Sequence, residues 1–112
     1  MTTLAENHCE ACRADAARIS TSELKEMQPD IPEWTLVQVE GVDQLFRQFK
    51  FKNFVQALEF ANKVGEIAEE NDHHPKISVE WGKVTVHWWT HKIKGLHKND
   101  VIMAAKTDQL LR

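Results

Sequence analysis

The 112-residue chain carries 14 basic and 17 acidic side chains, so its net charge of −3 gives no electrostatic footprint for nucleic acid. No apolar run approaches the roughly 18 residues of a membrane span, and the N-terminus lacks the apolar segment of a signal peptide. We therefore expect one small domain, soluble and cytoplasmic, with a core modest enough that self-association would add stability.

Residues 1–19 show no sustained apolar period, and we expect a flexible N-terminal arm before a domain that covers residues 20–112. Within the arm, Cys9 and Cys12 form a CxxC motif with His8 beside it. One such pair is half of a zinc ribbon, so a closed structural zinc site within one chain is not expected. We interpret the arm as a reduced tail, with metal or redox chemistry as the alternative.

A short helix and a hairpin of two strands are predicted to begin the domain. Ser20 and Glu23 have the spacing of a capping box, which starts a helix that runs to about Gln28. Alternating apolar residues then predict two strands, at residues 34–39 and 45–51, joined by a turn at 41–43. The second strand has phenylalanines on both faces, so the pattern leaves open which face is buried.

A long amphipathic helix is expected next. Asn53 can cap its start, and the helix should run from about residue 54 to 70 and end at Asn71 or Asp72. Its predicted buried stripe consists of residues three or four positions apart, as one face of a helix requires. The members of this stripe are Phe54, Leu58, Ala61, Gly65 and Ala68, and Val55, Val64 and Ile67 widen it.

A second hairpin follows this helix. Apolar and polar residues alternate in two runs, residues 77–81 and 84–89. Gly82-Lys83 lies between the runs and suits a two-residue hairpin turn. Such a turn would place Trp81 opposite Val84, and we expect Trp81 and Trp88 to pack in the core.

The predicted order is helix, strand, strand, helix, strand, strand and helix. The last helix should begin near residues 97–99, where His97 would be a weak cap. Two hairpins separated by a helix, with no βαβ repeat, indicate an antiparallel sheet with helices on one side. The expected fold class is α+β: a four-stranded antiparallel sheet with two main helices and a short N-terminal helix packed on one face.

Three histidines near the second hairpin are the strongest candidates for chemistry. His73 and His74 precede Pro75, and a proline pushes the residue before it out of the helical region. This pair should therefore lie on a non-helical corner, and the hairpin should bring His91 back towards it. Histidine suits proton transfer because its ordinary pKa is roughly 6.5. We expect a proton-handling site; three surface or metal-binding histidines are the alternative.

The spacing of polar and aromatic residues between positions 69 and 100 resembles that of a known family. The chain has Glu69, then His73-His74-Pro75, Trp81, His91 and Asp100. This arrangement closely resembles the signature of the pterin-4a-carbinolamine dehydratases, also called 4a-hydroxytetrahydrobiopterin dehydratases, over roughly residues 20–112. The stretches at residues 1–4, 8–15 and 88–91 look most like the bacterial members. The fold that the resemblance implies is the same α+β layer.

The resemblance implies a hydro-lyase that removes water from a 4a-hydroxytetrahydropterin. It would form the quinonoid dihydropterin and so recycle the cofactor of aromatic amino-acid hydroxylases. The departing hydroxide needs a proton and a ring N–H must lose one, whereas neither step needs a metal or another cofactor. The expected catalytic residues are His73, His74 and His91, with His73 and His91 as the general acid and base and His74 as the residue that orients the pterin.

Six further residues are expected around these histidines. The predicted substrate-binding residues are Asp72, Trp89, Thr90 and Lys92. Asp72 could instead cap the helix end, and Trp89 could stack on the pterin or cover a subunit contact. Glu69 and Asp100 are expected as supporting groups. Asp100 would brace His91, or stabilise the N-terminus of the last helix, or do both.

The expected partners are a small pterin substrate and further copies of the chain. We expect a homodimer or homotetramer, because apolar residues at an outer sheet edge favour pairing. The resemblance also implies a functional link to phenylalanine hydroxylase. Two alternatives remain: a regulatory partner of that hydroxylase or of a transcription factor, as among animal relatives, and a small metal-binding protein that uses His73, His74 and the CxxC.

Overall fold

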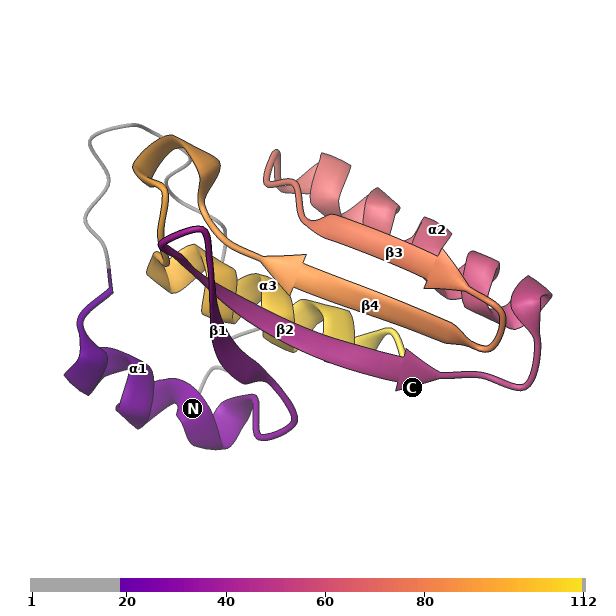
Figure 1. Cartoon of the computed structure of the whole chain (residues 1–112), viewed down its shortest axis with the longest axis horizontal. Helices are drawn as coiled ribbons and strands as arrows, with labels where there is room; N and C mark the ends of the chain where they lie inside the picture. The colour runs from indigo at the N-terminus through magenta and orange to yellow at the C-terminus, as the bar shows by residue number, and fades with distance from the viewer. Residues whose placement is uncertain (1–18, 112) are drawn as a thin grey trace.

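The computed structural model describes residues 19–111, which form a four-stranded antiparallel sheet with the two long helices on one face (Figure 1). The expected α+β fold class is confirmed. The predicted arm lies outside the described residues, apart from Ile19. The helices are α1 (Thr21–Met27), η2 (Gln28–Asp30), α2 (Phe54–Glu70), η3 (His91–Ile93) and α3 (Lys98–Gln109). The strands are β1 (Thr35–Val39), β2 (Val42–Lys50), β3 (Lys76–Glu80) and β4 (Lys83–Trp88).

Side-chain caps set the starts of the first two helices where the sequence places them. The Ser20 hydroxyl accepts the Glu23 N–H at 3.1 Å, and the Glu23 carboxylate accepts the Ser20 N–H in return. At the start of α2, Asn53 Oδ1 accepts the Gln56 N–H at 2.9 Å. Each cap satisfies backbone donors that the first turn of a helix leaves unpaired.

The strand order β1-β2-β4-β3 places the two hairpins side by side. Helix α2 connects β2 to β3, and the chain then returns through β4, which pairs with β2 from Leu45 opposite Trp88 to Lys50 opposite Lys83. Strand β4 is therefore paired on both sides. The residues that follow Trp88 leave from the middle of the sheet and form the loop that contains η3.

The core lies between the sheet and helices α2 and α3, and this settles which face of β2 is buried. Leu45 and Phe49 are buried, and the Phe49 ring lies 4.6 Å from that of Phe60 in α2. Phe46 lies on the other face, where its ring stacks on His87. Strand β4 contributes three side chains with no exposed surface, Val84, Val86 and Trp88.

The expectation that Trp81 is a core residue is wrong, because the hairpin turn lies one residue earlier than predicted. Val79 is paired with Val84, so the two turn residues are Trp81 and Gly82. Gly82 has a φ of +69°, and a Cβ there would lie 3.1 Å from the Phe51 carbonyl oxygen. Glycine is therefore required at the second turn position, and Trp81 is left at the tip with 73 % of its surface exposed.

The predicted stripe of α2 is also wrong in part. Phe54 and Leu58 are exposed, because the helix turns Phe60 and its neighbours towards the sheet instead. The buried residues are Ala57, Phe60, Ala61, Val64 and Ala68. Within residues 19–111, no helix combines the length and the apolar character needed to cross a membrane.

The helix-free face of the sheet carries His87. Its Nδ1–H donates to Gln44 Oε1 at 3.0 Å, and its ring lies 5.5 Å from that of Phe46. Burial, and then the nearby Lys76 ammonium, hold the pKa of His87 below its ordinary value.

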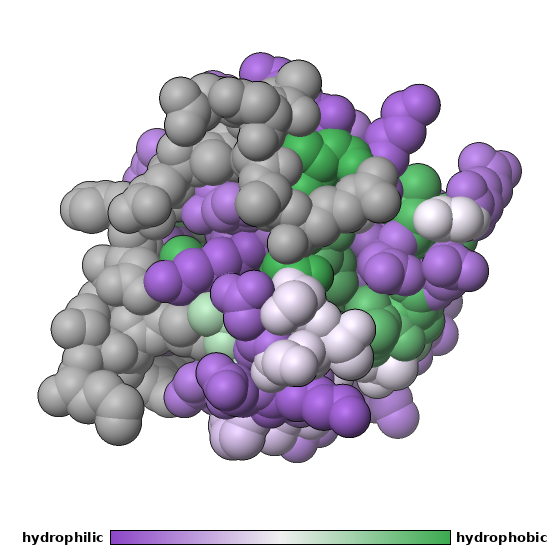
Figure 2. All heavy atoms as spheres, turned by 90° about the vertical axis from the view of Figure 1, so that its left-hand side faces the viewer, coloured by the Kyte–Doolittle hydropathy of each residue, from purple (hydrophilic) through white to green (hydrophobic). Residues whose placement is uncertain are grey.

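Figure 2, which views the molecule from the left of Figure 1, shows hydrophobic surface (green) among hydrophilic side chains (purple).

Lowering the pH from 7.5 to 5.5 is expected to destabilise the fold partly through His87. The unfolded chain takes up a proton there near pH 6.5, whereas the folded chain does so only at lower pH. The contribution of His87 is thus complete above pH 6.5 and is lost as the pH falls. Urea unfolding at both pH values should show a smaller loss for His87→Gln than for the unsubstituted chain. Equal losses would contradict the assignment.

Candidate active site

The end of α2 forms the corner that carries the first two histidines. Asp72 has a φ of +49°, in the left-handed region, and its N–H donates to the Glu69 carbonyl. The His73 N–H donates to the Ala68 carbonyl at 3.1 Å. This pair of bonds is the Schellman arrangement, which closes a helix and turns the chain away from it. Pro75 then prevents the helix from continuing, so the corner is fixed as the sequence indicates.

His73 is buried, with 3 % of its surface exposed, and its ring is held on two sides. Its Nε2 lies 2.6 Å from Asp100 Oδ1, and because a carboxylate oxygen accepts, Nε2 carries the proton. The ring stacks parallel to Trp88, with 5.7 Å between centroids and 4° between planes. Buried Trp88, at the end of β4, therefore supports one face of the His73 ring.

Asp100 joins three parts of the chain. Besides His73, its carboxylate accepts the Thr90 hydroxyl at 2.8 Å and the His97 N–H at 2.9 Å, both at Oδ2. The His97 ring in turn accepts the Asn99 N–H at Nδ1, which completes a capping box at the start of α3. Asp100 therefore stabilises the helix N-terminus as expected. The contact that sequence reasoning assigned to His91 is made with His73.

Sequence reasoning missed the part that His97 plays. Imidazole was expected to be a weak cap, yet His97 caps α3 and its backbone helps to hold the Asp100 carboxylate. The signal was available, because an acidic residue three positions after a cap is the spacing of a capping box. The orientation of buried Asp100 is thus set partly by the start of α3, through the His97 N–H, and not only by its contact with distant His73.

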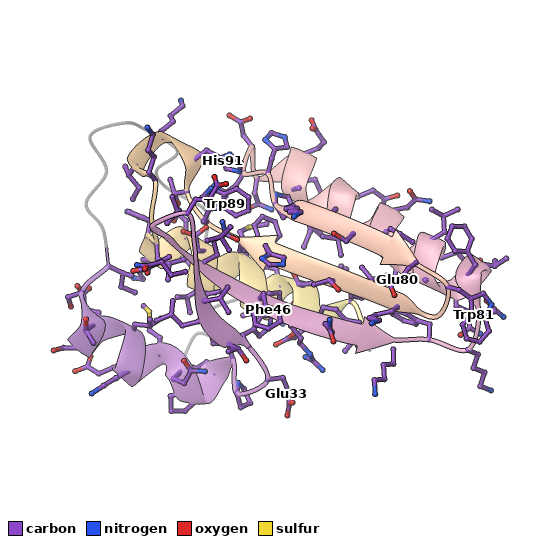
Figure 3. The ribbon with its side chains drawn as sticks, in the orientation of Figure 1. Glu33, Phe46, Glu80, Trp81, Trp89 and His91 are labelled. Atoms are coloured by element: carbon purple, nitrogen blue, oxygen red, sulfur yellow. The ribbon has the colours of Figure 1, made fainter. Side chains whose placement is uncertain are left out.

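His74 and His91 lie on the exposed side of the corner. The Nε2–H of His74 donates to Glu69 Oε1 at 2.9 Å, so Glu69 supports His74 rather than His73. The Nε2–H of His91 donates to the His74 carbonyl at 3.0 Å. Figure 3 shows His91 beside Trp89, and the two rings stack with 4.3 Å between centroids and 22° between planes.

A pocket of about 240 Å³ opens between the corner and the loop after β4. Its lining brings together six of the residues predicted from the sequence: Asp72, His73, His74, Thr90, His91 and Lys92. The other three predicted residues lie outside the lining. Asp100 is behind His73, Glu69 pairs with His74, and the Trp89 ring stacks on His91.

The arrangement suits proton transfer. One histidine is buried against a carboxylate, and two exposed histidines face the same pocket from different segments. The His73 and His74 rings diverge, since one pairs with Asp100 inside and the other with Glu69 outside. Among residues 19–111, no three His, Cys, Asp or Glu side chains are arranged to hold a metal ion.

The fold and site define an α+β protein with a pocket that three histidines line from two separate segments. A sequence model of the family described as pterin 4 alpha carbinolamine dehydratase matches residues 17–110. The chain therefore belongs to the pterin-4a-carbinolamine dehydratase family.

Individual relatives agree with this assignment. Proteins from Saccharophagus degradans and Nitrosococcus oceani, each named "Putative pterin-4-alpha-carbinolamine dehydratase", are similar to this chain. The first is 60 % identical over 98 % of this chain and 97 % of its own length, and the second is 56 % identical over 100 % and 99 %. A crystal structure of a transcriptional coactivator/pterin dehydratase from Brucella melitensis is similar with a TM-score of 0.74 and 32 % identity, covering 84 % of this chain and 98 % of that one.

Proposed function

We propose that this chain is a hydro-lyase that dehydrates a pterin 4a-carbinolamine to the quinonoid dihydropterin, with its histidines as general acid and base. The observation that carries the proposal is the pocket, which three histidines line from two separate segments. Membership of the dehydratase family supports the substrate class. The contacts between Asp100 and His73 support the choice of acid–base chemistry.

Two proton movements make up the reaction. The bond between the ring carbon and the hydroxyl oxygen breaks, and the oxygen takes a proton and leaves as water. The neighbouring ring nitrogen gives up its proton, and the electron pair of that N–H bond forms the new C=N bond. A hydroxide leaves poorly without a proton, so a general acid on one side of the ring and a base on the other would accelerate the reaction.

His73 and His91 are the proposed acid and base. His73 Nε2–H points to Asp100, whose carboxylate holds the ring orientation and would stabilise the positive charge on a doubly protonated ring. His91 donates Nε2–H to the His74 carbonyl, which leaves Nδ1 as the nitrogen that exchanges a proton. His74 pairs with Glu69 and has the proposed role of orienting the pterin.

The other polar residues that line the pocket are proposed to bind the part of the pterin that does not react. Asp72 is an exposed carboxylate in the pocket, and a carboxylate can accept hydrogen bonds from an aminopyrimidine edge. The Thr90 hydroxyl donates to Asp100 and the Thr90 N–H donates to Gly95, so the group proposed to face the pterin is the Thr90 carbonyl oxygen, which can accept a second bond. Lys92 lies at the same opening and would contact the substrate from the loop side.

The chemistry of substrate and product places the reaction between two others. A hydroxylase that leaves oxygen on the pterin ring must supply the carbinolamine, and a reductase must consume the quinonoid product. We therefore propose that the chain recycles the pterin of an aromatic amino-acid hydroxylase, with phenylalanine hydroxylase as the functional partner. We further propose a homodimer or homotetramer, because exposed apolar side chains invite association. They include Phe54, Val55 and Leu58 on α2.

A dehydratase assay on the purified full chain tests the proposed function. Synthetic 4a-carbinolamine should form quinonoid dihydropterin faster with the protein than without it, as followed by absorbance. Activity should survive exhaustive chelation, because the proposed steps are proton transfers only. Activity lost on chelation and restored by one metal would favour the metal-binding alternative. No acceleration by the folded chain would overturn the proposal.

Replacing Asp72 by glycine is expected to raise stability and lower activity together. Asp72 is in the left-handed region, which costs about 1–2 kcal/mol for a residue with a Cβ and less for aspartate. Glycine should therefore raise the free energy of unfolding by up to about 1 kcal/mol, since relief of the left-handed strain exceeds the extra entropy of the unfolded chain, while removing the carboxylate raises KM. Urea unfolding and steady-state kinetics measure the two effects. Asp72→Asn is the control, and an unchanged KM in both variants would leave Asp72 with the helix-closing role alone.

A further inference from the structure

We infer that Trp89 is a positioning residue that holds the His91 ring in its working orientation, an inference that rests on the proposed function. His91 is exposed, at the start of the three-residue helix η3. A surface imidazole with one hydrogen bond can still rotate about that bond. The indole of Trp89 lies against it, with 4.3 Å between ring centroids and 22° between planes.

The two contacts on His91 restrain different motions. The hydrogen bond from Nε2 to the His74 carbonyl fixes one atom of the ring at 3.0 Å. The stack on Trp89 fixes the plane of the ring, because offset aromatic pairs favour a narrow range of geometries. Together they determine where Nδ1 points. Without the indole, the ring could turn about its remaining hydrogen bond and carry Nδ1 away from the substrate.

Trp89 is itself held firmly enough to act as a support. It is partly buried and packs against the core cluster. Buried Trp88 precedes it and buried Thr90 follows, so its backbone is anchored on both sides. Thr90 N–H donates to the Gly95 carbonyl at 2.8 Å, and the Gly95 N–H donates back to Thr90, which closes the loop that contains His91.

The position of Trp89 favours action through His91 over direct contact with substrate. The pocket that His91 lines does not include Trp89 in its lining. Trp89 instead lines a separate cavity of about 480 Å³ on the helix-free face, together with His87 and Gln44. Removing the Trp89 indole should therefore impair the chemical step more than substrate binding. If Trp89 stacked on the pterin instead, its removal would mainly weaken substrate binding.

Substitutions of different shape provide the test. Trp89→Leu should lower kcat about tenfold and leave KM within about twofold, because small misplacement of a catalytic group costs up to about 10²-fold. Trp89→Phe keeps a flat ring and should restore most of kcat. Trp81→Leu is the matched control, since Trp81 is exposed at the opposite end of the molecule (Figure 3) and should leave both constants unchanged.

Proton NMR of the His91 ring gives a readout that does not depend on activity. Stacking on an indole shifts these protons upfield, and the shift should vanish in Trp89→Leu and largely persist in Trp89→Phe; His91→Gln identifies the signals. An unchanged His91 spectrum in Trp89→Leu would overturn the inference. A raised KM with normal kcat would also overturn it, in favour of substrate stacking. If the unsubstituted chain proves inactive, the proposed function fails, and the proposed positioning role fails with it even where the spectrum still shows the stack.

Discussion

Replacing Asp100 by alanine is expected to cause the largest combined loss of stability and activity of any single substitution in this chain. Asp100 has no exposed surface and accepts bonds from His73, Thr90 and the His97 backbone. Alanine would remove the acceptor that these three donors share, and the contacts with His73 and Thr90 are buried. Breaking a buried pair of this kind costs about 3–5 kcal/mol, a large share of the roughly 5–15 kcal/mol that holds a domain together.

Asp100→Asn separates the catalytic part of this loss from the structural part. Asparagine keeps the shape of aspartate but places a donor or a weaker acceptor opposite His73 Nε2–H. His73 would then favour the tautomer that carries its proton on Nδ1. A carboxylate partner normally prevents this, because it keeps the proton on the nitrogen that faces it. We expect a folded protein, destabilised by about 1–3 kcal/mol, whose kcat falls about 10²- to 10⁴-fold.

Urea unfolding, circular dichroism and steady-state kinetics on both Asp100 variants provide the measurement. Asp43→Ala is a suitable control, because Asp43 is an exposed carboxylate in the β1–β2 hairpin, away from the pocket. Near-normal kcat in a folded Asp100→Asn variant would show that the carboxylate only caps α3. A loss of stability without a loss of kcat in the alanine variant would lead to the same conclusion.

Local sequence signals predicted the elements and the corner well. The capping box of Ser20 and Glu23, the Asn53 cap and the α2 bounds depend on interactions within a few residues. The corner at His73 was predictable for the same reason, because Pro75 acts on the residue directly before it. Six of the predicted site residues line one pocket, although that agreement came from the family spacing and not from periodicity.

Features that depend on tertiary contacts were harder to predict. The one-residue shift of the hairpin turn left Trp81 exposed. Gly82, at the second turn position, lies close to the Phe51 carbonyl, which is far from it in sequence. The buried stripe of α2 was ambiguous, because two overlapping sets of apolar residues satisfy the helical period. Phe60 was selected by its contact with Phe49 across the core.

The partners of the two supporting carboxylates could not be assigned from spacing alone. Glu69 is four residues before His73 and five before His74. In a continuous helix, a spacing of four would bring Glu69 to His73, but the chain leaves the helix after Glu70 and Glu69 contacts His74 instead. Asp100 was expected near His91, nine residues away, but it reaches His73, 27 residues away. In both cases the direction of a side chain at a helix end decides the contact.

Removing His73 and His91 together is expected to reduce kcat far more than removing either one. One general acid or base contributes about 10²- to 10⁴-fold, and the two rings reach the same pocket from different segments. If they serve opposite sides of one pterin ring, each single variant should retain part of the catalysis. His73→Gln is preferred to alanine, because its amide can still donate to the buried Asp100 carboxylate.

The roles of the three histidines then follow from steady-state kinetics on His73→Gln, His91→Ala, His74→Ala and the His73→Gln/His91→Ala double variant. His74→Ala should raise KM and leave kcat nearly unchanged, because uniform binding affects substrate and transition state alike. His87→Gln is the matched control, since His87 lies on the helix-free face and outside the pocket. A folded double variant with near-normal kcat would remove His73 and His91 from the mechanism. The opposite result for His74→Ala would be an unchanged KM together with the lowest kcat of the three single variants. That result would mean that His74, and not His73, moves the proton.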